Sequence, residues 1–363
     1  MRARLVSLLI VSSATAFAKD VHQTPDVDAK FVGAVGCKSS SCHGGAGEKR
    51  SQYITWSQKD FHTRAYAILL DARSARIGEA VGVSPQSSAR CTVCHSPFQS
   101  LAETRLTSTA RPDEGVSCES CHGAAEPWLR GHTRTDWSYP TRVAAGMHDL
   151  RNLYMRANAC VACHQNVDAD ILKAGHPELV FELDSQSVNE PKHWREDDPA
   201  IGPRSWLTGQ AVALREITWA LIKSPPDERS QLLDQENALV WLLDKTGFGN
   251  DLSKFSALPG IQQRANEIAE RAAKWNPTSD SLMSILQTLA ACDSEFQATS
   301  GSKENLFYRA LRVTLGLERL AGALNLSPKI EKELNALRSD VQRHYDFDVT
   351  AFAGHLRALR TKL

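Results

Sequence analysis

The sequence has no excess charge of either sign and no long hydrophobic run beyond its N-terminus. Lysine and arginine total 42, and aspartate and glutamate total 42, so the net charge is zero. A balanced surface gives no basic field that would attract nucleic acid and no acidic tail, so charge says little about binding partners. No later segment reaches the roughly 18 consecutive apolar residues that a membrane-spanning helix needs. We therefore expect the mature protein to be soluble.

Signals for β-strands are also scarce, and the second half of the chain contains no phosphate-binding loop and no nucleophile constellation. The hydrophobic content of 42% and the charged content of 23% are ordinary for a globular protein. These features predict a mainly α fold: an N-terminal cofactor-binding part with little regular sheet, followed by a C-terminal helical bundle.

The first 18 residues, MRARLVSLLIVSSATAFA, have two arginines, an apolar run and a small-residue ending. This pattern predicts a signal peptide over residues 1–18, cut after Ala18, and export to the periplasm. A membrane anchor is the alternative, but the apolar run from Leu5 to Val11 is too short to span a bilayer. No cysteine lies near the cut, which argues against a lipid anchor. Residues 19–30 are expected to form a mobile N-terminal segment.

Cysteine, in contrast, is plentiful and regularly spaced. There are nine cysteines, an odd number that fits a disulfide framework poorly. Three sites read Cys-x-x-Cys-His, at Cys91–His95, Cys118–His122 and Cys160–His164, and a fourth, CKSSSCH at Cys37–His43, has four residues between its cysteines. Disulfides and zinc are alternatives for a Cys-x-x-Cys pair alone. The histidine after each pair favours c-type haem attachment.

The spacing suits this chemistry. Two cysteines three residues apart lie on one face of a helical turn, so their sulfurs can each bond one vinyl group of the same porphyrin. The next histidine then offers its imidazole to the iron as the proximal ligand. In the CKSSSCH motif the loop must bulge to bring both sulfurs to one haem. We expect four covalent haem c groups, attached at Cys37, Cys42, Cys91, Cys94, Cys118, Cys121, Cys160 and Cys163, with proximal ligands His43, His95, His122 and His164.

Histidine outnumbers methionine as a source of the second axial ligand. The chain has twelve histidines and four methionines, which favours bis-histidine irons at most sites. His132, in WLRGH, can fold back over its own haem or over a neighbouring one. In WSQKDFHTRAYAILL, Trp56, Tyr66 and Leu69 fall near one helical face. His62 lies in the same segment and is therefore expected to point inward as an iron ligand.

Further candidates lie later in the chain. Pro177 keeps His176 out of helical geometry, so that His176 can approach an iron. His193 and His148 compete for the fourth distal position, and Met147 is a poorer candidate; the histidine that is not a ligand would lie at the surface or hydrogen-bond a propionate. An iron with an open position would bind small ligands such as nitric oxide or peroxide.

The composition changes near residue 204, where cysteines almost disappear and helical periodicity takes over. We therefore expect a tetrahaem cytochrome c domain over residues 31–203, with a core made mostly of cofactor, and a helical domain over residues 204–363. Short links between the helices predict antiparallel pairs in a bundle. The predicted helices span residues 205–223, 227–245, 259–275, 278–291, 305–324, 328–344 and 351–363.

The helical half contains no second metal motif. It could cap the haem domain, dock a partner or drive dimerisation. Cys292, the ninth cysteine, lies in an apolar helical stretch and is expected to be a buried, inert thiol, with a redox role as the alternative. His344 and His355 are expected to be structural, and His22 falls in the N-terminal segment.

Six quoted segments occur in a characteristic order: FVGAVGC, WSQKDFH, GVSCESCHG, WLRGH, RANACVACH and AGHPELVFEL. In this order they resemble the multihaem cytochromes c of the cytochrome c-554 type, from about Phe31 to Trp194. The resemblance implies a periplasmic electron carrier with four covalent haems in close contact, often as parallel and perpendicular pairs. It also implies distal positions for His62, His132 and His176. The four-residue insert in the first motif and the long helical extension depart from this pattern.

Three functions follow from the sequence. The leading hypothesis is a non-catalytic relay of electrons between redox protein partners, because closely packed haems form a conducting row. The alternative is an oxidoreductase acting on a small nitrogen or oxygen species at a five-coordinate haem. A third possibility is an assembly role, in which the helical half docks the relay into a homo-oligomer or a larger complex. No decisive acid–base pair supports the enzyme, so whether the protein is one stays open.

Overall fold

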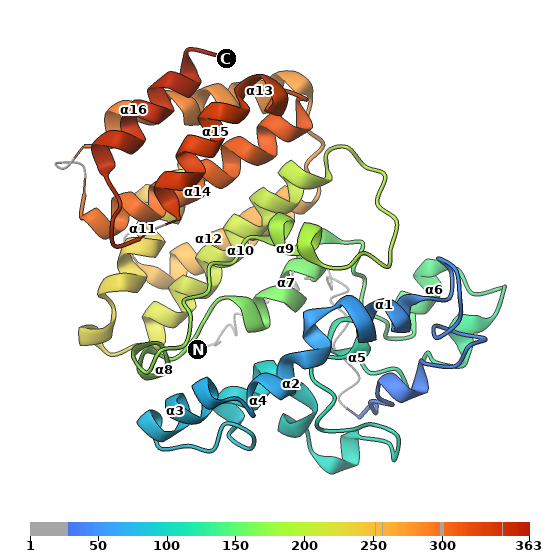
Figure 1. Ribbon diagram of the computed structural model, residues 1–363. Coiled ribbons are helices and arrows are strands. Elements are labelled where there is room, and N and C mark those ends of the chain that lie inside the picture. Colours follow the sequence, from blue (N-terminus) through green and yellow to red (C-terminus); the bar gives the residue numbers. More distant parts are fainter. Residues whose placement is uncertain (1–27, 251, 256, 298–300, 343) are drawn as a thin grey trace, which may run out of the picture.

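The computed structural model describes residues 28–250, 252–255, 257–297, 301–342 and 344–363. The predicted signal peptide and His22 lie outside these residues. The described part of the chain is built from helices and turns and has no strand; its β structure is a single parallel bridge between Phe31 and Leu106. The prediction of a mainly α fold with little sheet is confirmed (Figure 1).

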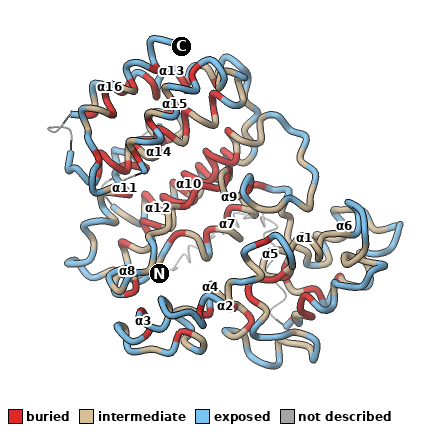
Figure 2. The backbone as a smooth tube through the Cα atoms, viewed as in Figure 1, coloured by how far each residue is buried: buried red, intermediate tan, exposed pale blue. Residues whose placement is uncertain are grey.

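The N-terminal half consists of short helices joined by long turns. Its small hydrophobic cluster contains Val32, Ala125 and Trp128, and buried positions are sparse along this part of the chain (Figure 2). The α-helices are α1 (Gln52–Lys59), α2 (Ala65–Ile68), α3 (Ala72–Val81), α4 (Ala89–His95), α5 (Cys118–His122), α6 (Tyr139–Ala144), α7 (Leu153–His164), α8 (Ala169–Lys173) and α9 (Leu183–Asn189). The 3₁₀ turns are η1 (Ala34–Gly36), η2 (Phe61–Arg64), η3 (Pro97–Ser100), η4 (Glu103–Arg105) and η5 (Gly131–Thr133).

The C-terminal half is a bundle of longer helices close to the predicted ones. Its α-helices are α10 (Ile201–Lys223), α11 (Ser230–Lys245), α12 (Leu258–Ala273), α13 (Ser279–Ala290), α14 (Lys303–Ala323), α15 (Ser327–Val341) and α16 (Val349–Arg360). The 3₁₀ turns are η6 (Pro226–Glu228), η7 (Leu252–Lys254) and η8 (Ala291–Glu295).

Local signals explain where these helices start and stop. Helix α10 ends before Ser224 and the two prolines that follow, because proline disfavours helical geometry in the residue before it. Thr278 and Ser281 form a capping box that starts α13. Helix α10 begins at Ile201, earlier than the predicted start at residue 205.

Helix α10 joins the two halves of the molecule. It packs against α11, α12 and α14 on one side and against α7 and α9 on another (Figure 1). It is buried on nearly all faces (Figure 2), as expected for a helix inside a bundle. The main hydrophobic core therefore includes Leu153, Phe181 and Leu183, which precede residue 204. The core is continuous across the predicted domain boundary, and the division at 203/204 stays a prediction.

Within the described residues, no helix combines the length and the hydropathy needed to cross a membrane.

Candidate haem sites

A large cavity opens among the short helices of the N-terminal half. Its volume is about 2780 Å³, whereas a site for one drug-sized ligand occupies about 300–1,000 Å³. It is lined by every motif cysteine and by nine histidines: His43, His62, His95, His122, His132, His148, His164, His176 and His193. The cavity is therefore large enough for several large ligands and brings the chemistry-bearing residues of the sequence together.

Three of the motifs occupy the last turn of a helix. Helices α4, α5 and α7 end at His95, His122 and His164, respectively. Both cysteines of each motif thus lie within one helical turn, and the histidine stands where the chain leaves the helix. Helix α5 stops at Gly123, whose φ of +81° favours glycine.

The CKSSSCH motif is not helical. Cys42 donates its backbone N–H to the Ser39 carbonyl at 2.9 Å, and His43 donates to the Cys37 carbonyl at 3.2 Å. These turns fold the longer insert into a loop whose ends meet. The attachment of both cysteines to one haem requires a loop of this kind and stays a prediction.

Each motif histidine faces a second histidine from a distant part of the chain. The ring centroids are 6.1 Å apart for His43 and His132, 6.4 Å for His95 and His176, 6.4 Å for His122 and His193, and 5.9 Å for His164 and His62. Two imidazoles bound at about 2 Å on opposite sides of a metal have nitrogens about 4 Å apart and ring centroids about 6 Å apart. All four pairs have the spacing that one metal ion between the rings requires.

The outer ring nitrogen of most of these histidines is already occupied. Nδ1 lies 3.0 Å from Gln52 Oε1 in His43, 3.1 Å from the Ala65 carbonyl in His95, 2.5 Å from the Leu129 carbonyl in His132, 2.8 Å from the Pro177 carbonyl in His176, and 3.4 Å from the Pro191 carbonyl in His193. All of these partners are acceptors, so Nδ1 carries the hydrogen. Nε2 keeps its lone pair and is the nitrogen available to a metal.

The structure separates the two candidates for the fourth distal position. His193, and not His148, faces His122. The Nδ1 atom of His148 lies 2.9 Å from the Cys121 carbonyl, and its ring packs so closely on Gly123 that a Cβ atom there would lie 2.8 Å from it. His148 therefore supports the backbone of the third motif. His132 faces His43 of the first motif, so it reaches over a neighbouring site and not over its own.

The expected single helical face around His62 is wrong. Helix α1 ends at Lys59, and Asp60 is extended, with φ −85° and ψ 126°. The Asp60 carboxylate accepts the backbone N–H of His62 at 2.8 Å, so Asp60 caps the 3₁₀ turn η2 and breaks the helix. Because of this break, His62 is positioned opposite His164 by a cap, not by helical periodicity.

Burial sets the protonation of most of the site. It lowers the pKa of His122 to about 4, and it also lowers the pKa of His95 and His164. A neutral imidazole is the form that binds a metal. His62 behaves differently: hydrogen bonds first to Asp60 and then to Glu190 raise its pKa to about 10, against the effect of burial.

The motifs lie next to one another. Cys37 of the first motif and Cys118 of the third are hydrogen-bonded, which lowers the pKa of Cys37. Cys94 of the second motif is paired in the same way with Cys163 of the fourth, with the same effect on its pKa. Helix α5 also packs against α7, so the third motif adjoins the fourth. The cysteines are free, and none of these contacts is a disulfide.

The donor set fits haem better than zinc. A zinc site would need several histidine, cysteine or acidic side chains close together. Among the described residues, the side chains close enough to share one ion are those of Asp60, His62 and Glu190, and none of them is a motif cysteine. Arg142 lines the cavity, and its buried Nε has no hydrogen-bond partner among the described atoms. A carboxylate such as a haem propionate would satisfy this donor.

Sequence reasoning missed Glu119, the first variable residue of CESCH. Its side chain is buried and accepts the backbone N–H groups of Val32, Gly33 and Ala125, at distances from 2.6 to 3.0 Å. It ties the segment before the first motif to the loop after the third. Nothing in the motif marks this position, since any residue can stand there. Gln52, Arg142 and Glu190 were also missed, because they lie outside the motifs.

Residues 36–123 match the family model for cytochrome c554 and c-prime. No curated protein and no solved structure gave a significant match. The matched segment holds the first three motifs and His62, and the match supports covalently bound haem c and a role in electron transfer. The resemblance drawn from the motifs is thereby confirmed for this segment: residues 36–123 are similar to the cytochrome c554 and c-prime family.

Proposed function

We propose that the protein is a periplasmic tetrahaem cytochrome c that relays electrons between redox partners through closely packed, bis-histidine haems. The observation that carries this proposal is the set of four histidine pairs, one for each attachment motif, at ring distances of 5.9–6.4 Å. A chance arrangement would not give every motif its own partner at the spacing of a shared iron.

The residues that would hold each haem follow from these pairs. Cys37 and Cys42 would attach the first haem between His43 and His132. Cys91 and Cys94 would attach the second between His95 and His176. Cys118 and Cys121 would attach the third between His122 and His193. Cys160 and Cys163 would attach the fourth between His164 and His62.

Bound haem would supply one-electron chemistry between ferric and ferrous iron. The chain contributes the order of the attachment sites. The contact of Cys37 with Cys118 joins the first site to the third, the packing of α5 on α7 joins the third to the fourth, and the contact of Cys94 with Cys163 joins the fourth to the second. We infer a single row of sites, with the first and second motifs at its two ends.

The histidine pairs favour a relay over the alternative of an enzyme with an open iron. Each motif histidine already has an opposing imidazole, so each proposed iron would have six ligands and no position for substrate. Electron paramagnetic resonance of the oxidised protein is expected to show low-spin signals. A high-spin ferric signal equivalent to one iron per chain would favour the enzyme.

Export, the haem domain over residues 31–203 and redox protein partners belong to the same proposal. The pattern of residues 1–18 and the need of thioether attachment for an exported chain support the periplasm. The donor and acceptor would meet the two ends of the row, so partner docking is expected near the first and second motifs.

The test is a count of haems on the exported, mature protein. We expect four haems per chain in a pyridine haemochrome assay and a polypeptide mass that exceeds the mass of the mature sequence, after the cut at Ala18, by four haems. Replacing both cysteines of one motif by alanine should remove one haem. Two haems or fewer per chain in the unaltered protein would exclude the proposal.

A further inference from the structure

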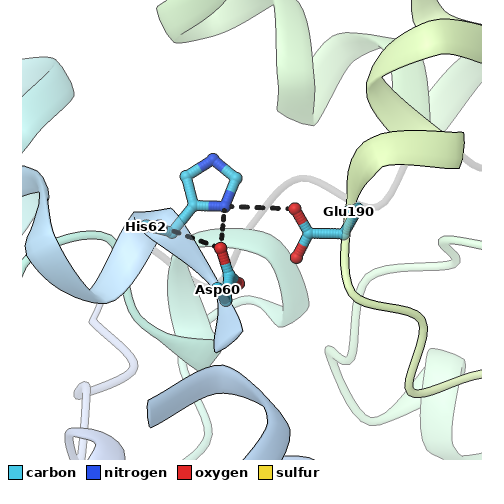
Figure 3. Close-up of side chains that lie close together, drawn as sticks. All are labelled: Asp60, His62 and Glu190. Carbon is cyan, nitrogen blue, oxygen red and sulfur yellow. Dashed lines mark hydrogen bonds and ion pairs between the residues drawn. The ribbon is translucent and has the colours of Figure 1, made fainter. Parts of the chain in front are cut away.

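His62 differs from the other ligand candidates in what its Nδ1 touches. Nδ1 lies 3.0 Å from Asp60 Oδ1 and 3.3 Å from Glu190 Oε2, so two carboxylates share its hydrogen (Figure 3). The Nδ1 partners found for His43, His95, His132, His176 and His193 are an amide or backbone carbonyls, all uncharged. Among the eight rings, His62 alone has carboxylate acceptors within the described part of the chain.

The two carboxylates come from different parts of the fold. Asp60 stands between α1 and η2 and also accepts the backbone N–H of His62. Glu190 follows the last residue of α9, a helix that packs on α10 of the C-terminal bundle. In Figure 3 they approach the same ring nitrogen, and the other ring nitrogen points away from both carboxylates. The ring is thus held in a fixed orientation by two segments that are far apart in the chain.

The negative charge is poorly screened. The Asp60 side chain is 7% exposed and that of Glu190 is 23% exposed, and buried charges are little screened by salt. Even if the two carboxyls share one proton, one negative charge stays beside the ring. Arg156 on α7, a cation that lines the same cavity, is already paired with Glu196 at 2.8 Å.

A charged acceptor on Nδ1 makes an imidazole a stronger donor to its metal. A stronger donor and an adjacent negative charge both stabilise ferric iron relative to ferrous iron, so both lower the reduction potential. We propose that Asp60 and Glu190 are positioning residues that fix His62 and lower the reduction potential of the haem attached at Cys160 and Cys163. This inference rests on the proposed function and assigns to the fourth site a tuning device that the other three lack.

The test is a redox titration of the full, haem-loaded protein, followed by absorption. The variants Asp60→Asn and Glu190→Gln keep the shape of each side chain and remove its charge. We expect the midpoint potential of one of the four one-electron components to rise in each variant and to rise further in the double variant. At a fixed applied potential, the double variant should change the reduced-to-oxidised ratio of that component at least tenfold. This change corresponds to a shift of about 59 mV in its midpoint potential.

Two further variants make the test specific. Glu331→Gln removes an exposed carboxylate on α15, outside the cavity lining, and should leave all four components in place. Gln52→Glu puts a carboxylate beside His43 Nδ1, which now faces Gln52 Oε1 at 3.0 Å. This variant should lower the potential of a different component, that of the first site, and it keeps the inference testable if the other variants fail to fold.

A second readout separates tuning from mere support. The low-spin electron paramagnetic resonance signal of one haem should change its g-values in Asp60→Asn and Glu190→Gln, while the haem count stays at four.

Four low-spin haems whose potentials do not respond to these variants would overturn the inference and leave the proposed function intact. A bound cation other than iron, found at one per chain by elemental analysis and lost in Glu190→Gln, would also overturn it, because the carboxylates would then be neutralised. Two haems or fewer per chain in the unaltered protein would instead refute the proposed function.

Discussion

Two histidines near the third motif make different contacts. His193 presents its ring to His122 at 6.4 Å, whereas His148 lies against Gly123 and hydrogen-bonds the Cys121 carbonyl. The sequence alone could not choose between them, because both stand in short segments without helical periodicity. The contacts of each ring in the folded chain distinguish the candidate ligand His193 from His148.

We predict that His193→Ala leaves one haem without its distal ligand. About a quarter of the iron should become high-spin, because the third site would keep only His122 as an axial ligand. The measurement is electron paramagnetic resonance of the oxidised protein, with haem content as a check on folding. His148→Ala is the matched control and should stay fully low-spin. The reverse pattern in the two variants would contradict the assignment.

At the scale of elements, the C-terminal helices hold the segment that carries the distal candidate His176. Tyr308 on α14 donates to Glu178 Oε1 at 2.7 Å, and Gln235 on α11 donates to the same atom at 2.6 Å. Glu178 stands two residues after His176. Arg312, also on α14, is fully buried and donates to the Phe181 carbonyl at 2.8 Å. The bundle thus fixes the path of residues 176–181 beside the cavity.

Removing one of these bonds should loosen His176. We predict that Tyr308→Phe lowers the free energy of unfolding by about 1 kcal/mol and speeds the binding of added cyanide or imidazole at the second site. Stopped-flow absorption and chemical denaturation measure the two effects. Tyr345→Phe, at a side chain that is 95% exposed, should change neither. Equal ligand-binding rates in all three proteins would show that the bundle does not control this ligand.

The crossing of α14 over α10 depends on a glycine. A Cβ at Gly316 would lie 2.6 Å from the ring of Trp206, a side chain that is fully buried. We predict that Gly316→Ala lowers the free energy of unfolding by about 1–3 kcal/mol, because the rigid ring cannot move aside. Gly322 lies on the same helix, where a Cβ would meet Ser327 Oγ at 4.0 Å, an ordinary contact distance, so Gly322→Ala should raise stability by about 0.5–1 kcal/mol. Guanidinium unfolding followed by circular dichroism measures both.

At the scale of the whole molecule, the two halves obtain their stability from different sources. The C-terminal half has a continuous hydrophobic core, while the N-terminal half surrounds a cavity of about 2780 Å³ and has a small cluster of its own. An interior is normally close-packed, so filling the cavity with cofactor would complete the fold of this half.

We therefore predict that protein made without haem attachment keeps the C-terminal bundle and loses the order of the N-terminal half. Limited proteolysis should cut residues 31–150 quickly and leave a helical fragment containing α10–α16. The haem-loaded protein should resist the same treatment. Equal resistance of both forms would show that the N-terminal half packs without its cofactor.

The thiols give a second test on the whole chain. Cys292 is buried and donates to the Thr288 carbonyl, and burial raises its pKa to about 11. Its thiol is therefore protonated at neutral pH and unreactive, because the thiolate is the nucleophile. The native holoprotein should show no reactive thiol, and the unfolded holoprotein should show one. Each motif without haem would add two thiols to the unfolded count.

The sequence by itself determined the four attachment motifs, the family resemblance and most of the C-terminal helices. These features depend on residues close together in the chain: cysteines one turn apart, capping threonine and serine, and prolines that stop helices. Local rules misjudged the region of His62, where the Asp60 cap outweighed helical periodicity.

Only the tertiary structure decided which histidine faces which motif. The partners are more than 70 residues apart in the chain, and most of the distal histidines lie on turns and extended segments whose paths are fixed by packing against other elements. The same holds for Glu119 and Glu190, whose roles exist only where distant backbone or ring nitrogens come within hydrogen-bonding distance. Spacing along the chain specifies a local motif, whereas the pairing of distant side chains depends on how the helices pack.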